Sequence, residues 1–163
     1  MRLLAYALLA VTAALTGLYL MSRRAARAPL AAEGFALDLT TPQGALRMYQ
    51  AAVAARDLDG MVAVKDFEYE ARQTLQGKSQ GIEGDPEVTT LTAKTLEAAY
   101  RAEWQNRDWP DLSGVVTYYS EALPLDSTTV QVVEVLQLPS GAKERSLVKV
   151  VRRGSEWRVV HAP

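Results

Sequence analysis

Apolar residues recur at helical spacing over three stretches of the chain. The first begins after Thr41, which can cap a helix, and the proline that follows it suits a first helical turn. The second begins at Asp57, and the third begins at Asp85 and ends before Pro110. The apolar positions are Leu46, Tyr49, Ala52, Val53, Met61, Val62, Val64, Phe67, Ala71, Leu75, Val88, Leu91, Leu96, Ala99, Tyr100 and Trp104. The pattern predicts three helices, with a corner near Asp57 between the first two.

After Gly114 the pattern changes to one that is typical of strands. Segments rich in valine and other strand-forming residues cover 115–122, 130–138, 145–152 and 157–161, and short polar turns separate them. Such turns predict an antiparallel meander. Helices followed by a run of strands predict the α+β class. We therefore expect a cone-like domain of about three helices packed on a curved four-stranded antiparallel sheet.

An uncharged segment rich in leucine and alanine occupies residues 3–21. Its length just reaches what a helix needs to cross the hydrocarbon core of a membrane. We expect residues 1–22 to be a transmembrane anchor. A cleaved signal peptide is the alternative, because residues 26–28 offer a small-residue cleavage pattern. Residues 23–40 would then be a juxtamembrane linker and residues 41–163 the folded domain.

The charges beside this segment bear on its orientation. Three arginines follow it, whereas only Arg2 and the α-amino group precede it. The positive-inside rule therefore favours a single-pass protein of the bacterial inner membrane whose C-terminal domain is cytoplasmic. The margin is one charge, so a periplasmic domain stays open as an alternative.

Charge also restricts the partners of the folded domain. Residues 1–30 contain four arginines and no acidic residue, which leaves 14 basic and 19 acidic side chains in the remainder. A mildly acidic domain is poorly suited to a phosphate backbone, so we expect no nucleic-acid binding. The chain contains no cysteine, which excludes disulfides and thiolate metal sites.

Two segments resemble the nuclear-transport-factor-2-like superfamily. Residues 49–63, YQAAVAARDLDGMVA, are similar to its first helical hairpin, which turns at a D-L-D-G corner, and residues 154–160, GSEWRVV, are similar to its last strand. The resemblance implies a cone in which a curved antiparallel sheet wraps the helices and can enclose a pocket.

Shorter motifs are similar to bacterial immunity proteins of this fold. TPQGA at 41–45, KDF at 65–67 with EA at 70–71, LEAAYRAE at 96–103 and PDLSG at 110–114 occur in the order of that family. This resemblance implies a protein that neutralises a cognate toxin by binding it. We expect no cofactor.

Enzymes of the superfamily offer a contrasting expectation. Ketosteroid isomerases polarise a carbonyl with a tyrosine at the position of Tyr49 and a protonated aspartate, and a second carboxylate moves the proton. Gln73 stands where that family has its base, and an amide cannot accept a proton near neutral pH. We therefore predict no catalytic residues. A small-molecule-binding or isomerase-like cone is the alternative, and it predicts a pocket lined by Tyr49, Trp104 and Glu134.

An acidic cluster marks one candidate contact surface. Asp66, Glu68 and Glu70 lie close together in the second helical stretch. They could form an acidic surface for a basic partner. They could equally be a solvated helix face on which Lys65 or Arg72 reduces the repulsion.

Trp109 and His161 are the last two residues considered for a functional role. Trp109 lies in a polar loop, where it could anchor an interface or pack down and fix the loop. His161 is the single histidine and has no ligand spacing around it, so no metal site is expected. The leading expectation is an immunity protein. The alternatives are the ligand-binding cone and a membrane-tethered accessory subunit of an envelope complex.

Overall fold

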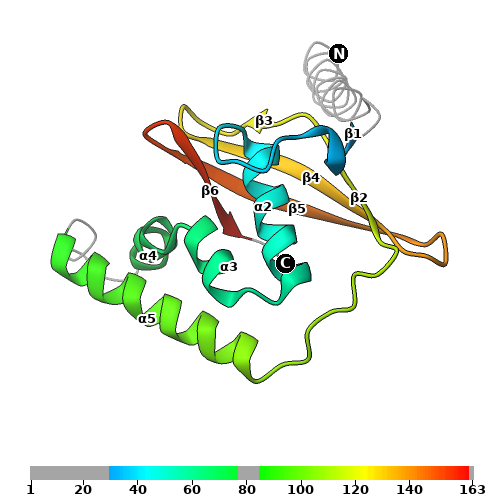
Figure 1. Cartoon of the computed structure of the whole chain (residues 1–163). Coiled ribbons are helices and arrows are strands. Elements are labelled where there is room, and N and C mark those ends of the chain that lie inside the picture. The colour runs from blue at the N-terminus through cyan, green and yellow to red at the C-terminus, as the bar shows by residue number, and fades with distance from the viewer. Residues whose placement is uncertain (1–29, 77–84, 162–163) are drawn as a thin grey trace, which may run out of the picture.

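The computed structural model describes residues 30–76 and 85–161 (Figure 1). In chain order the elements are β1 (Leu30–Ala31), the 3-10 turn η1 (Ala32–Gly34), α2 (Pro42–Ala55), α3 (Leu58–Val64), α4 (Phe67–Leu75), α5 (Pro86–Gln105), β2 (Val116–Tyr119), β3 (Leu123–Pro124), β4 (Thr129–Gln137), β5 (Lys143–Arg153) and β6 (Glu156–His161). The predicted α+β class is confirmed.

The sheet is antiparallel, with the order β1-β2-β4-β5-β6 and with β3 beside β4. Its four longer strands correspond to the four predicted strands, whereas the two-residue strands β1 and β3 were not predicted. In Figure 1, α2 lies across the sheet, and α3, α4 and α5 form a layer beside it with α5 at the outer edge. Alternate valines of β4 and β5 face α2 in the main core, whose buried members include Leu46, Val53, Val130, Val132, Val148, Val150 and Val159.

The predicted corner at Asp57 is present. Arg56 ends α2 in the left-handed region with φ of 56°, and the Asp57 side chain accepts a hydrogen bond from the backbone N–H of Gly60 at the start of α3. A β-carbon at Gly60 would lie 2.4 Å from Asp57 Oδ2, so the glycine is required for this close approach.

The prediction of one continuous second helix is wrong, because the chain leaves the helical conformation at Lys65 and Asp66. Lys65 is extended, with φ of −83° and ψ of 157°, and forms a bridge with Val159 of β6. The backbone N–H of Asp66 donates to the carbonyl of Val159, and the Asp66 side chain then caps α4 by accepting from the N–H of Tyr69. Within the described residues, the four α-helices α2 to α5 therefore replace the three that were expected.

The N-terminal expectations fall partly outside the described residues. Residues 3–21 lie outside them, and no helix within 30–76 and 85–161 is long and apolar enough to span a membrane. The described part of the expected linker packs on the domain. The backbone N–H of Trp157 donates to the carbonyl of Leu39 at 2.7 Å, and the rings of Phe35 and Tyr119 lie 5.9 Å apart.

Candidate functional site

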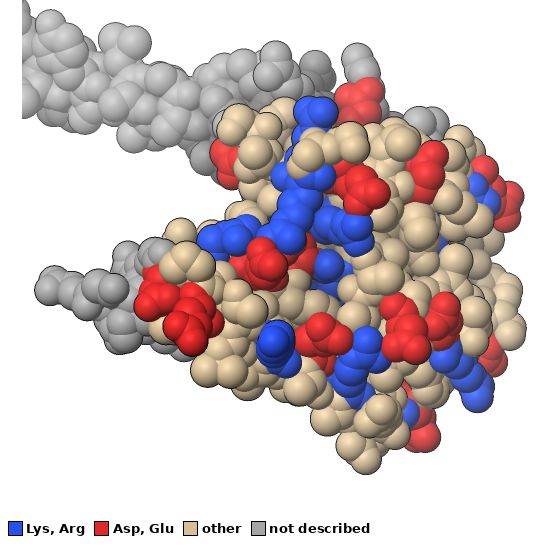
Figure 2. All heavy atoms as spheres, turned by 60° about the vertical axis from the view of Figure 1, so that its left-hand side comes forward, with Lys and Arg blue, Asp and Glu red and all other residues tan. Residues whose placement is uncertain are grey.

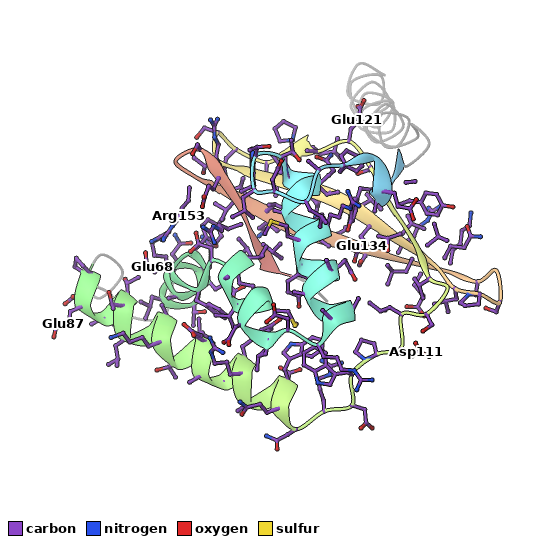
Figure 3. All side chains as sticks on the ribbon, viewed as in Figure 1. Glu68, Glu87, Asp111, Glu121, Glu134 and Arg153 are labelled. Atoms are coloured by element: carbon purple, nitrogen blue, oxygen red, sulfur yellow. The ribbon has the colours of Figure 1, made fainter. Side chains whose placement is uncertain are left out.

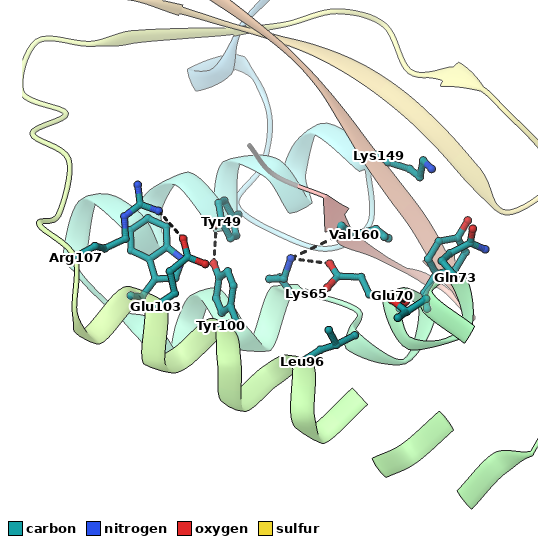
Figure 4. Close-up of a pocket in the computed structure, with 13 residues that line it drawn as sticks. Tyr49, Lys65, Glu70, Gln73, Leu96, Tyr100, Glu103, Arg107, Lys149 and Val160 are labelled. Atoms are coloured by element: carbon teal, nitrogen blue, oxygen red, sulfur yellow. Dashed lines mark hydrogen bonds and ion pairs between the residues drawn. The ribbon is translucent and has the colours of Figure 1, made fainter. Parts of the chain in front are cut away.

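A cavity of about 550 Å³ opens between α2, α4, α5 and the last strands. We call it the mouth cavity (Figure 4). Its walls are formed by Tyr49, Lys65, Tyr69, Glu70, Gln73, Thr74, Leu96, Tyr100, Glu103, Trp104, Arg107, Lys149 and Val160. Polar and aromatic groups from segments far apart in the sequence thus converge on one space.

Two tyrosine hydroxyls meet in the wall of the mouth cavity. Tyr49 Oη and Tyr100 Oη are 2.7 Å apart and share a hydrogen bond. Burial raises the pKa of both phenols above the ordinary value. Both groups are therefore neutral at physiological pH, and each hydroxyl already has a partner.

An ion pair lies in the same wall. Lys65 Nζ is 2.7 Å from Glu70 Oε1 and also donates to the carbonyl of Val160 at 3.4 Å. The ammonium lies 5.0 Å from the ring centroid of Tyr100 and 5.4 Å from that of Phe67, within the range of cation–π attraction. Only 6 % of the Lys65 side chain is exposed, so its charge is balanced largely by protein groups.

Aromatic rings and an arginine form the other end of the cavity. The guanidinium carbon of Arg107 lies 4.5 Å from the ring centroid of Trp104, and Arg107 Nη1 is 3.2 Å from Glu103 Oε1. Trp109 is half-buried, with its ring centroid 4.9 Å from that of Trp104. Trp109 therefore packs on the domain at this end of the cavity.

The three residues named for a possible pocket come together in a second hollow. Tyr49, Trp104 and Glu134 all line a space of about 310 Å³, which we call the Glu134 hollow. Figure 3 shows Glu134 between α2 and the sheet. Its carboxylate accepts hydrogen bonds from Gln50 Nε2 at 2.9 Å and Ser146 Oγ at 3.3 Å. Burial raises the pKa of Glu134, because only 4 % of the residue is exposed.

The acidic cluster does not form one exposed face. The Asp66 side chain is 2 % exposed, caps α4, and lies 3.0 Å from Arg153 Nε, although its Oδ2 makes no hydrogen bond of good geometry. Glu68 is half-exposed and pairs with Arg153, whereas Glu70 lies in the wall of the mouth cavity. Figure 2 shows acidic and basic side chains interleaved on the face that it presents. A cation lies beside each of the three acids: Arg153 beside Asp66 and Glu68, and Lys65 beside Glu70.

The contents of the mouth cavity bear on proton transfer. Gln73 lines the same cavity as Tyr49, and an amide does not accept a proton near neutral pH. Within the described ranges, no group of three or more histidine, cysteine, aspartate or glutamate side chains could hold a metal ion. The side chain of His161 lies outside the description.

The partners of Glu134 were not predicted from the sequence. Ser146 is opposite Glu134 in the β4–β5 register, and Gln50 follows Tyr49 on α2. The pairing register was the missing signal, because alternation within one strand does not fix which residues of its neighbour lie opposite.

No family model and no curated protein matches the sequence. The crystal structure of a Campylobacter jejuni protein named "Putative NTF2-like transpeptidase" is similar to this chain at 10 % identity, with a TM-score of 0.34, over 70 % of this chain and 92 % of that one. In this chain the antiparallel sheet curls around α2.

Proposed function

We propose that this chain is a non-catalytic binding protein that recognises its partner at the mouth cavity. The observation that carries the proposal is Gln73, an amide in the cavity of Tyr49. Two pairs of polar groups in this wall are engaged with each other: Tyr49 with Tyr100, and Glu70 with Lys65. A surface of this kind suits recognition better than proton transfer.

We further propose that the partner is a cognate bacterial toxin. The motifs similar to immunity proteins supply much of the mouth cavity. The segments 65–67 and 70–71 contribute Lys65 and Glu70, and the segment 96–103 contributes Leu96, Tyr100 and Glu103. This convergence of separate motifs on one cavity supports a shared binding role.

We also propose a cellular location for the chain. Residues 3–21 would anchor the chain in the inner membrane, with residues 30–163 on the cytoplasmic side. A topology reporter fused after Pro163 is expected to be active in the cytoplasm. Periplasmic activity would favour the accessory subunit of an envelope complex instead.

Co-expression tests the toxin proposal directly. The full chain is expressed with toxins encoded beside its gene, and both growth rescue and complex formation are measured. Arg107→Glu reverses an exposed charge at the mouth cavity and is expected to weaken both. Glu87→Lys reverses an exposed charge at the far end of α5 and is the matched control. Absence of both rescue and complex with every such toxin contradicts the proposal.

A ligand-binding cone is the second candidate function. The specific observation in its favour is that Tyr49, Trp104 and Glu134 line one hollow of about 310 Å³. This volume lies at the lower end of the range for small-molecule sites, which is roughly 300–1,000 Å³.

A further inference from the structure

Glu134 is a buried acid whose charge is not balanced by a cation among residues 30–76 and 85–161. Its hydrogen-bond donors are the neutral side chains of Gln50 and Ser146. A carboxylate offers about four lone-pair positions, and these donors occupy two of them. Buried carboxylates in folded proteins are usually paired with a cation or coordinate a metal, because an isolated buried charge is unfavourable.

The surroundings of Glu134 form a built site. The hollow combines aromatic walls, Tyr49 and Trp104, with the apolar side chains Val53, Leu112 and Leu136. Its other charged groups lie on exposed residues, namely Glu144, Arg145 and Arg107. Tyr119 stands opposite Glu134 in the β2–β4 register and is fully buried. The inner end of the hollow is therefore acidic and the wall beside it is apolar.

We propose that the Glu134 hollow binds an organic cation with an ammonium head group, which pairs with Glu134 while its carbon chain contacts Trp104 and Val53. This inference rests on the second candidate function and names its ligand class. An ammonium supplies both the missing charge and donors for the open lone pairs, and charge-assisted hydrogen bonds are about twice as strong as neutral ones. An anion would bring a like charge to the buried carboxylate.

The ammonium can come from two sources with the same chemistry: a free alkylamine or the lysine side chain of a protein partner. Butylamine represents the first source and N-acetyl-lysine methylamide the second. Tighter binding of the lysine derivative assigns the head group to a protein partner, and tighter binding of butylamine assigns it to a free amine.

Isothermal titration calorimetry on the purified full chain tests the proposal. Butylamine is expected to bind, and its neutral isostere butanol is expected to bind at least tenfold more weakly. Glu134→Gln is expected to weaken butylamine binding at least tenfold. Glu87→Gln removes an exposed acid of α5 that lies outside the hollow and should leave the affinity within about twofold.

Other results of the titrations would contradict the proposal. The cation proposal is overturned if butanol and butylamine bind equally well, or if Glu134→Gln binds butylamine as well as the wild type does. Either result is still consistent with a ligand-binding cone. If neither butanol nor butylamine binds, the cation proposal and the ligand-binding cone are both overturned. If Glu134→Gln does not fold, the Glu144→Gln variant decides, since Glu134 is then the remaining carboxyl group that lines the hollow. Its butylamine affinity must rise between pH 4.5 and 7.5, and a flat profile overturns the proposal.

Discussion

The hydroxyl oxygens of Tyr49 and Tyr100 lie 2.7 Å apart, although 51 residues separate the two in the chain. Their hydrogen bond joins the central helix α2 to the outer helix α5, which otherwise packs mainly on α4 and α3. The pair therefore contributes both to the wall of the mouth cavity and to the attachment of the outer helix.

Tyr100→Phe is expected to lower the free energy of unfolding by about 1–3 kcal/mol, because it leaves the buried Tyr49 hydroxyl without its partner. Urea denaturation of the full chain measures the change. Tyr118→Phe, at a half-buried tyrosine outside both hollows, is the matched control and should change stability by less than about 0.5 kcal/mol. The double variant Tyr49→Phe/Tyr100→Phe should lose less than the sum of the single changes, and strict additivity would contradict a shared bond.

Lys65→Met is expected to lower the free energy of unfolding by about 3–5 kcal/mol, because it breaks a largely buried ion pair and removes a cation that lies near the rings of Phe67 and Tyr100. The comparison is Arg101→Met, which removes a partly exposed arginine that pairs with Asp59 and Glu97. That change should cost clearly less than Lys65→Met does. Equal effects of the two substitutions in thermal or urea unfolding would show that burial of Lys65 contributes nothing.

The two acidic residues Asp66 and Glu68 are expected to behave differently, although they are two positions apart. Asp66→Ala should lower the free energy of unfolding by about 1–2 kcal/mol, because it removes the cap of α4 and the buried partner of Arg153. Glu68→Ala should change it by less than about 0.5 kcal/mol, since Glu68 is half-exposed. Urea denaturation distinguishes them, and a large effect of Glu68→Ala alone would reverse the assignment.

Local signals in the sequence account for the features that were predicted well. Asp57 and Gly60 specify the corner after α2 through a cap and a close approach, and both are contained within a few residues. The break at Lys65 was missed because its cause lies in β6, where Val159 pairs with this segment. Helical periodicity continues across the break, and the local signal that was overlooked is Asp66, a residue type that caps helices.

The candidate site, too, was predicted from the sequence only in part. Tyr49, Trp104 and Glu134 were named from the chain, and they line one hollow. Asp66, by contrast, was considered for an exposed contact surface, but it is buried as a helix cap. An acidic residue before a helix fits both roles until the position of Arg153 is known.

The stability of the chain should depend on pH through Glu134. Burial raises the pKa of Glu134 in the folded state above the ordinary value of 4.5. The folded state then holds this proton more tightly than the unfolded state does. The contribution of Glu134 to stability is therefore complete below about pH 4.5 and is lost as the pH rises through the folded pKa.

Glu134→Gln carries no ionisable group at this position, so it should not suffer this loss. The difference in unfolding free energy between the variant and the wild type is expected to shift in favour of the variant as the pH rises from 4.5 to 8. Urea denaturation at several pH values measures this difference. Groups that titrate in both proteins contribute equally to the two free energies, so their effect cancels in the difference. Glu144→Gln, at an exposed acid of the same hollow, should give a nearly constant difference. A shift in favour of the wild type with rising pH would mean that the hydrogen bonds from Gln50 and Ser146 stabilise the charged form of Glu134 by more than burial destabilises it, contrary to the prediction.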